Sequence, residues 1–237
     1  MVTAHTMPRG CDVAPPELAQ VRTRSNDQDH AANIAEEARL CFVTHQPPHE
    51  ELIKRVLGTN VLELKLGRLA FEEADHTTTC KVSVIEGEQT IEMEAKGVGV
   101  VDAIFHALLD RYAREYQSLN TLHLTGFHVG AELATKKKDM GVDAVGLVTL
   151  DITNSEGRVF TFSDKSRSVT ISIARAVLKI VMYFVNAERA FVTLHNARRD
   201  AAARNREDLV SRYTAEMALV VESTSYAEVI ASIRKEL

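Results

Sequence analysis

The sequence predicts an α+β fold made of two duplicated strand–strand–helix units with pseudo-two-fold symmetry, flanked by N-terminal and C-terminal helices. Alternating apolar and polar residues in the middle of the chain indicate strands separated by glycine turns, and a helical pattern follows each group. The turn glycines Gly87 and Gly157 lie 70 residues apart, and the helix-opening residues Gly97 and Ser166 lie 69 apart. This nearly constant offset indicates an internal duplication.

The first 60 residues precede the duplication. Residues 1–27 are polar and contain proline without a periodic pattern, which predicts a mobile arm. Residues 28–60 form a helical lead-in: helical spacing runs up to Val43, and a second short helix follows and ends at Gly58.

The first predicted unit covers residues 61–118. Residues 61–74 alternate as a strand, and a hairpin follows in which Glu92 and Glu94 mark one solvated face rather than an acid–base pair. A helix then runs to about Tyr116. We therefore expect an antiparallel sheet with one buried face.

The second predicted unit covers residues 119–190. A strand at 119–130, a charged loop at 136–141 and two strands around a turn at Gly157 lead into a helix from about Val169 to Ala190. The helix is nearly all apolar, but its apolar run contains charged residues and is short for a membrane span, so we expect a buried helix. Because one two-layer unit cannot cover such a helix, we also predict a homodimer.

Residues 191–237 form a predicted helical tail. A thin apolar stripe runs along it, which favours docking on a neighbouring surface: Leu209, Tyr213, Met217 and Val220. Acidic residues alternate with five arginines, which indicates a solvated helix rather than an RNA-binding one: Arg198, Arg199, Arg204, Arg206 and Arg212.

Composition sets the broad class of the protein. The 237 residues suffice for a hydrophobic core, and 45% are hydrophobic and 26% charged. The net charge of −5 disfavours general nucleic-acid binding. Three widely spaced cysteines indicate neither a disulfide scaffold nor a zinc site, and the first 20 residues lack a signal-peptide core, so we expect a cytoplasmic protein without membrane contact.

A glycine pair, Gly97 and Gly99, precedes the first unit's helix. A dinucleotide site is disfavoured because Asp102 replaces the third glycine of the fingerprint and the preceding strand has a charged face. A phosphate loop is disfavoured because no Gly-Lys-Ser/Thr follows. Two interpretations stay open: a tight strand-to-helix turn, or a helix N-terminus that binds a small carboxylate. The duplication favours the second, because two helix N-termini facing each other would form one pocket.

These segments resemble a known family. Residues 97–108, GVGVVDAIFHAL, are similar to the G-x-G-P-V-D-A segment in the C-terminal regulatory domain of α-isopropylmalate synthases and citramalate synthases. Residues 141–144, Gly-x-Asp-Ala, and the closing helix that ends at Asn186 fit the same pattern. The resemblance covers about residues 61–190 and implies a dimerising domain that binds an end-product amino acid, or a similar effector, near both helix N-termini.

The resemblance also implies which residues contact the effector. They come from the two strand-to-helix turns: Gly97, Gly99, Val101, Asp102, Ser166, Ser168 and Ile171. The family has glycines where this chain has Ser166 and Ser168. A serine hydroxyl can cap a helix, but its Cβ narrows the place where the ligand approaches the backbone.

The expected function follows from the resemblance. In the family, catalysis belongs to a TIM barrel that binds a metal through a His-x-His pair. The 60 residues before the first strand are too few for such a barrel, and the sequence contains no His-x-His pair. We therefore expect no catalytic residues, metal or cofactor, and a regulatory module that senses a branched-chain amino acid or a keto acid, or acts on a separately encoded acyltransferase. A structural adaptor with a closed pocket, or an enzyme of new chemistry, are the alternatives.

Histidines and a cysteine give only a weak metal signal. His76 and Cys80 lie four residues apart, and His123 and His128 lie five apart, but no second pair has structural-zinc spacing. We expect these histidines at exposed strand ends.

Overall fold

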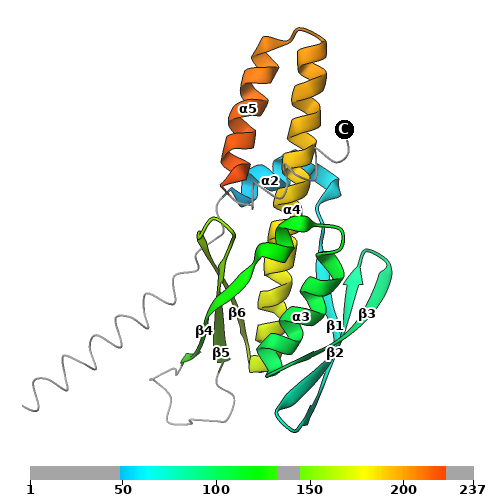
Figure 1. The fold of residues 1–237 in the computed structure, drawn as a ribbon, viewed down its shortest axis with the longest axis vertical. Coiled ribbons are helices and arrows are strands. Elements are labelled where there is room, and N and C mark those ends of the chain that lie inside the picture. The colour runs from blue at the N-terminus through cyan, green and yellow to red at the C-terminus, as the bar shows by residue number, and fades with distance from the viewer. Residues whose placement is uncertain (1–48, 133–144, 223–237) are drawn as a thin grey trace, which may run out of the picture. The chain divides into compact units, whose positions relative to one another are not determined.

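The computed structural model describes residues 49–132 and 145–222, and within them the predicted α+β fold is confirmed (Figure 1). All of these described residues belong to one compact unit. The predicted mobile arm, the first lead-in helix, the charged loop at 136–141 and the end of the predicted tail from residue 223 onward lie outside the described residues.

The first unit begins with the short helices α2 (Glu50–Leu57) and η1 (Gly58–Asn60). Three strands follow and form an antiparallel sheet in the order β1-β2-β3, and the helix α3 packs on β2 and β3. Their bounds are Leu64–Ala74 for β1, Thr77–Glu86 for β2, Gln89–Gly97 for β3 and Val100–Tyr112 for α3. The predicted lead-in helix ending at Gly58 is confirmed.

The second unit repeats this order. After η2 (Gln117–Thr121), three strands form a sheet in the order β4-β5-β6, and α4 packs on β5 and β6. The bounds are His123–Glu132 for β4, Val145–Thr153 for β5, Val159–Ser166 for β6, Val169–Ala203 for α4 and Glu207–Val221 for α5. Each unit thus has three strands before its helix, one more than a strand–strand–helix unit.

The duplication holds residue by residue in the strand pairing. Cross-strand partners of β1 and β2 have counterparts at the same register in β4 and β5. The pairs Leu66–Val84, Leu69–Val82 and Phe71–Cys80 correspond to Leu124–Ile152, Phe127–Leu150 and Val129–Val148. Both edge strands also carry a β-bulge at the same place, between Leu66 and Leu69 in β1 and between Leu124 and Gly126 in β4. A shared bulge position shows that the two sheets repeat one design.

Helix α4 is the centre of the core. It contacts β1, β5, β6, α2, α3 and α5, and its residues from Ile173 to Leu178 and from Val181 to Ala187 are mostly buried. By length and composition it could cross a membrane, but 67% of its most apolar window is buried inside the protein, as in a core helix. At 35 residues it is longer than the helix expected to end near Ala190. Because one chain covers α4, its apolar character does not require a second copy.

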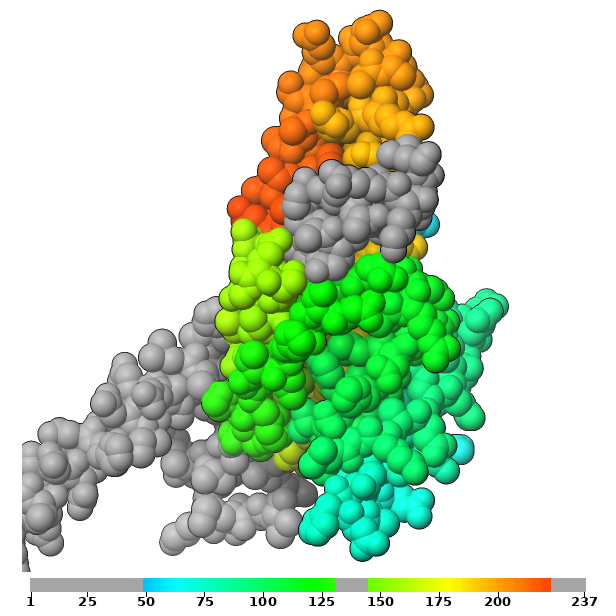
Figure 2. All heavy atoms as spheres, in the orientation of Figure 1, coloured from blue at the N-terminus to red at the C-terminus, as the bar shows by residue number. Residues whose placement is uncertain are grey.

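Helix α5 folds back along α4. The chain turns at Asn205, which has a φ of 55°, and α5 then contacts α4 and α2. The apolar stripe lies on this contact: Val220 is fully buried, and Tyr213 and Met217 pack against the core. Figure 2 shows this hairpin at one end of the described residues. The tail boundary expected after residue 190 thus falls inside α4, and the core continues beyond it.

Candidate functional site

The predicted effector loops are the two strand-to-helix turns, β3 to α3 and β6 to α4. Gly99 is the N-cap of α3 and Ser168 is the N-cap of α4, and both have extended backbone conformations. Figure 1 shows the two helix N-termini at the same end of the fold. The structure therefore gives the two loops equivalent places in the two units.

The two glycines of the first loop have different roles. A Cβ on Gly97 would lie 2.4 Å from the backbone nitrogen of Ala103, so only glycine lets the end of β3 approach the start of α3. A Cβ on Gly99 would meet nothing within 4 Å, and its φ of −158° is open to any residue. Gly97 fits the interpretation as a tight turn, whereas packing within the chain does not explain Gly99.

The side chain of Asp102 lies at the N-terminus of α3 and makes polar contacts there. Its Oδ2 accepts a hydrogen bond from the backbone N–H of Val98 at 3.0 Å, and its Oδ1 lies 3.4 Å from Nε2 of His106. A carboxylate in the first turn is favourable beside the helix dipole. The Asp102 side chain is 46% exposed, so this negative charge is accessible from solvent. Val101, beside it, is half-buried.

Hydroxyl groups close the N-terminus of α4. The Ser168 Oγ accepts from the backbone N–H of Ile171 at 3.4 Å and lies 2.9 Å from the hydroxyl of Thr170. Ser166 Oγ donates to the Ser168 carbonyl at 2.6 Å and accepts from the hydroxyl of the buried Ser172 at 2.9 Å. The first turn of α4 has no acidic residue. Thr170 and Ser172 also belong to this cluster, although the sequence did not lead us to predict a role for them. Their positions two and four residues after the N-cap could have indicated it.

At the cross-strand pair beside each turn, the glycine lies on a different strand in the two units. Gly97 pairs across the sheet with the buried Thr78, whereas Ser166 pairs with Gly146. Thr78 and Gly146 are themselves counterparts, 68 residues apart. Each unit therefore keeps one glycine at this pair, on β3 in the first unit and on β5 in the second.

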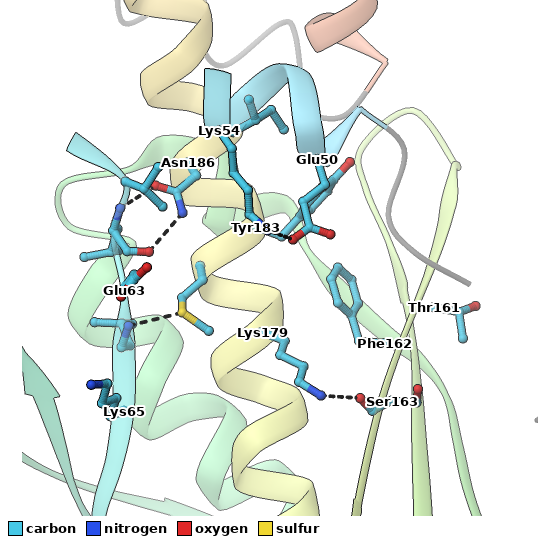
Figure 3. Close-up of a pocket in the computed structure, with 15 residues that line it drawn as sticks. Glu50, Lys54, Glu63, Lys65, Thr161, Phe162, Ser163, Lys179, Tyr183 and Asn186 are labelled. Carbon is cyan, nitrogen blue, oxygen red and sulfur yellow. Dashed lines mark hydrogen bonds and ion pairs between the residues drawn. The ribbon is translucent and has the colours of Figure 1, made fainter. Parts of the chain in front are cut away.

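A groove lies elsewhere, between the free edges of β1 and β6 (Figure 3). Its volume is about 510 Å³, α4 forms its floor and α2 borders one end. The residues that line it are Glu50, Ile53, Lys54, Val61, Leu62, Glu63, Leu64, Lys65, Thr161, Phe162, Ser163, Lys179, Met182, Tyr183 and Asn186. None of the seven predicted effector contacts is among them, so the groove is a separate site that the sequence analysis missed.

Side chains of α4 hold both walls of the groove. The Asn186 amide accepts from the N–H of Leu62 at 2.7 Å and donates to its carbonyl at 3.0 Å. On the opposite wall, Lys179 donates to the carbonyl of Ser163 at 2.7 Å and to Asp164 at 2.8 Å. The asparagine at the end of the resembled segment thus fastens the start of the first unit to the helix of the second.

Three buried ionisable groups lie away from both sites. Burial raises the pKa of Glu188, although the hydroxyl and N–H of Ser118 both donate to its carboxylate, at 2.6 and 3.2 Å. Burial also raises the pKa of Tyr112, which donates to Glu86 at 3.0 Å. Cys80 is fully buried, and burial raises its pKa to about 11. A thiol with such a pKa is a poor nucleophile.

The weak metal candidates do not come together. His76, His123 and His128 are exposed, while Cys80 is buried inside the first sheet. Across residues 49–132 and 145–222, no three His, Cys, Asp or Glu side chains are grouped to hold a metal ion.

Comparison with known proteins adds no family. No protein-family model matches the chain, and no characterised protein matches its sequence. What the chain does must therefore be argued from its own residues.

Proposed function

We propose that this chain is a non-catalytic regulatory module that binds a small amino acid at the paired N-termini of α3 and α4. The observation that carries the proposal is the duplication itself, which gives Gly99 and Ser168 equivalent N-cap positions at one end of the fold. Helix N-termini attract carboxylates through free N–H groups and the helix dipole. The similarity of residues 97–108 to the regulatory domain of α-isopropylmalate synthases supports the same role.

The two helix N-termini differ in charge, which favours an amino acid over a keto acid. Asp102 places an exposed carboxylate at α3, and α4 offers hydroxyls without an acid in its first turn. An ammonium group is attracted to Asp102, and a carboxylate is better placed against Ser168 and Thr170. A keto acid has only the second of these groups, so it binds more weakly.

The proposed module acts through association in the cytoplasm, with itself and with a separately encoded acyl-CoA-condensing enzyme. Phe127 and Val129 support self-association. Their cross-strand partners, Leu150 and Val148, are fully buried, so these two side chains lie on the core face of β4. Yet Phe127 is 43% exposed and Val129 is 50% exposed. A second chain covering this apolar face would complete the core of the second unit.

A structural adaptor is the second candidate. The observation that favours it is that the chain's own side chains already close both helix N-termini: Asp102 at α3, and Ser166 and Ser168 at α4. An adaptor would keep the association surface and bind no effector.

A thermal-shift series on the full chain separates the two candidates. Leucine, isoleucine and valine are compared with their 2-keto acids. At about 100 times its dissociation constant, a ligand adds about 2.7 kcal/mol of stability, or roughly 5–10 °C for a domain of this size. The module predicts such a shift with at least one amino acid and a smaller one with its keto acid. No shift with any of them supports the adaptor.

A further inference from the structure

We propose that the groove between β1 and β6 is the docking site of a segment of this chain, residues 44–48, which have the sequence THQPP and are called the proline segment below. This inference is independent of the helix N-termini, so it goes beyond the regulatory function proposed above. It starts from the place where the proline segment joins the described structure. His49 is the N-cap of α2, and the next residue, Glu50, lines the groove.

The chain enters α2 at the groove itself. Glu50, the first residue of α2, lines the groove together with Phe162 and Tyr183 (Figure 3). His49 has a φ of 61°, a left-handed conformation that changes the direction of the chain between the proline segment and the helix. Because the segment is covalently joined to α2, its docking is intramolecular and needs little affinity per residue.

The sequence predicts a polyproline II backbone for the proline segment. A proline fixes its own φ near about −65° and disfavours the helical conformation for the residue before it. Gln46 and Pro47 each precede a proline. Polyproline II rises about 3.1 Å per residue, so residues 44–48 span about 15 Å. The groove floor from Lys179 to Asn186 extends about 10 Å along α4, so the segment is long enough to cover it.

The edges of the groove suit an occupant that forms no sheet ladder. Asn186 already satisfies both backbone groups of Leu62 on one side, and Lys179 donates to the Ser163 carbonyl on the other. Side chains that block sheet edges in this way prevent the addition of a strand. A polyproline II segment needs no such ladder, and its prolines have no N–H to satisfy.

The floor of the groove offers the aromatic surface on which prolines pack. Tyr183 of α4 and Phe162 of β6 both line it, and their rings lie 5.6 Å apart in an edge-to-face arrangement. Aromatic-lined grooves are the usual docking sites of proline-rich segments. The rings are held by each other, so they present a fixed surface to the proline segment.

The charge of the lining also fits this segment. Three lysines line the groove, and they are balanced by two lining glutamates and by Asp164, which pairs with Lys179 at 2.8 Å. Lys54 pairs with Glu50 at 2.6 Å. The proline segment has no charged residue when His45 is neutral. An uncharged occupant leaves these pairs intact, whereas a charged one would be left without a partner.

Oxidation of Met182 measures whether the proline segment covers the groove. Met182 lines the groove and is partly buried. Hydrogen peroxide oxidises accessible methionine to its sulfoxide, and mass spectrometry of the digested full chain gives the rate at each methionine. The double variant Pro47→Gly, Pro48→Gly gives the undocked segment more conformational freedom, so the rate at Met182 should rise about fivefold or more.

Two reference methionines and a matched variant locate the effect. Met93 on β3 and Met217 on α5 lie outside the groove, and their oxidation rates should stay unchanged. The control Pro15→Gly, Pro16→Gly makes the same change at another Pro-Pro pair and should leave Met182 protected. Deletion of residues 223–237, or dilution by about a hundredfold, should also leave it protected.

A rise confined to Met182 in the first double variant supports the proposal. No rise there, or an equal rise in the control variant, would overturn it. A parallel rise at Met93 and Met217 would also overturn it, because the whole fold would then have loosened. A rise on deletion of residues 223–237 would assign the groove to the end of the chain, and a rise on dilution would assign it to a second copy.

Discussion

The geometry at the start of α3 predicts that replacing Gly97 by alanine destabilises the protein, whereas replacing Gly99 by alanine leaves its stability nearly unchanged. A Cβ on Gly97 would lie 2.4 Å from the Ala103 nitrogen and 2.8 Å from its Cα. Relief requires the helix to move by about 1 Å from the sheet, and forced overpacking of this kind costs about 1–3 kcal/mol. We expect Gly97→Ala to lose about 2 kcal/mol, which lowers the melting temperature by roughly 4–8 °C for a domain of this size.

Gly99→Ala is the matched control for this substitution. Its φ of −158° suits alanine, and the new Cβ would stand in open space. Lower entropy of the unfolded chain stabilises the variant, while the weaker N-cap preference of alanine destabilises it by a similar amount. The expected change is within about 0.5 kcal/mol. Urea unfolding followed by circular dichroism measures both variants, and equal stability of the two would refute the close contact at Gly97.

Two substitutions and one labelling experiment test the buried polar groups. The raised pKa of Glu188 means that the folded state binds its proton more tightly than the unfolded chain, so its contribution to stability is lost as pH rises through the folded-state pKa. The stability of the wild type relative to Glu188→Gln should therefore increase as the pH of urea unfolding falls from about 8 to about 5; a pH-independent difference would contradict the burial argument. Asn186→Ala should cost about 2–4 kcal/mol in the same assay at neutral pH, because it leaves both backbone groups of Leu62 without a partner, and a loss below about 1 kcal/mol would show that water replaces the amide. Cys80, in a variant whose other two cysteines are serine, should resist a thiol reagent until urea unfolds the chain, since it is fully buried; rapid labelling of the native protein would contradict this.

The sequence predicted the strands and turns because they depend on local signals. Alternation placed Glu92 and Glu94 on an exposed face, and the turn glycines Gly87 and Gly157 adopt φ of 59° and 77°, conformations that favour glycine. The repeat could be found because the spacing of the turns is nearly the same in the two units, even though their residues differ. The matching bulges in β1 and β4 could not be predicted, because they depend on which strands pair.

Long-range packing explains what the sequence did not predict. The apolar sequence of α4 led us to expect a second chain, but α2, which lies far earlier in the sequence, and α5, which folds back after a turn, pack against α4 in the same chain. The groove was missed for the same reason: its walls come from residues 61–65 and 161–163, about 100 positions apart. At the helix N-termini, the sequence predicted where the two strand-to-helix turns lie, but the packed Gly97 and the unhindered Gly99 are distinguished by the structure.

Calorimetric titration of the full chain with leucine, for the wild type and for Gly99→Ala, tests the proposed regulatory function most directly. Alanine at 99 does not disturb the fold, but it places a methyl group where a ligand would approach the N-terminus of α3. The proposal predicts saturable binding to the wild type and a loss of about tenfold or more in Gly99→Ala, with unchanged stability of the unliganded variant. Leucine binding of equal affinity in the two proteins, or no binding of any branched-chain amino acid to the wild type, would contradict it.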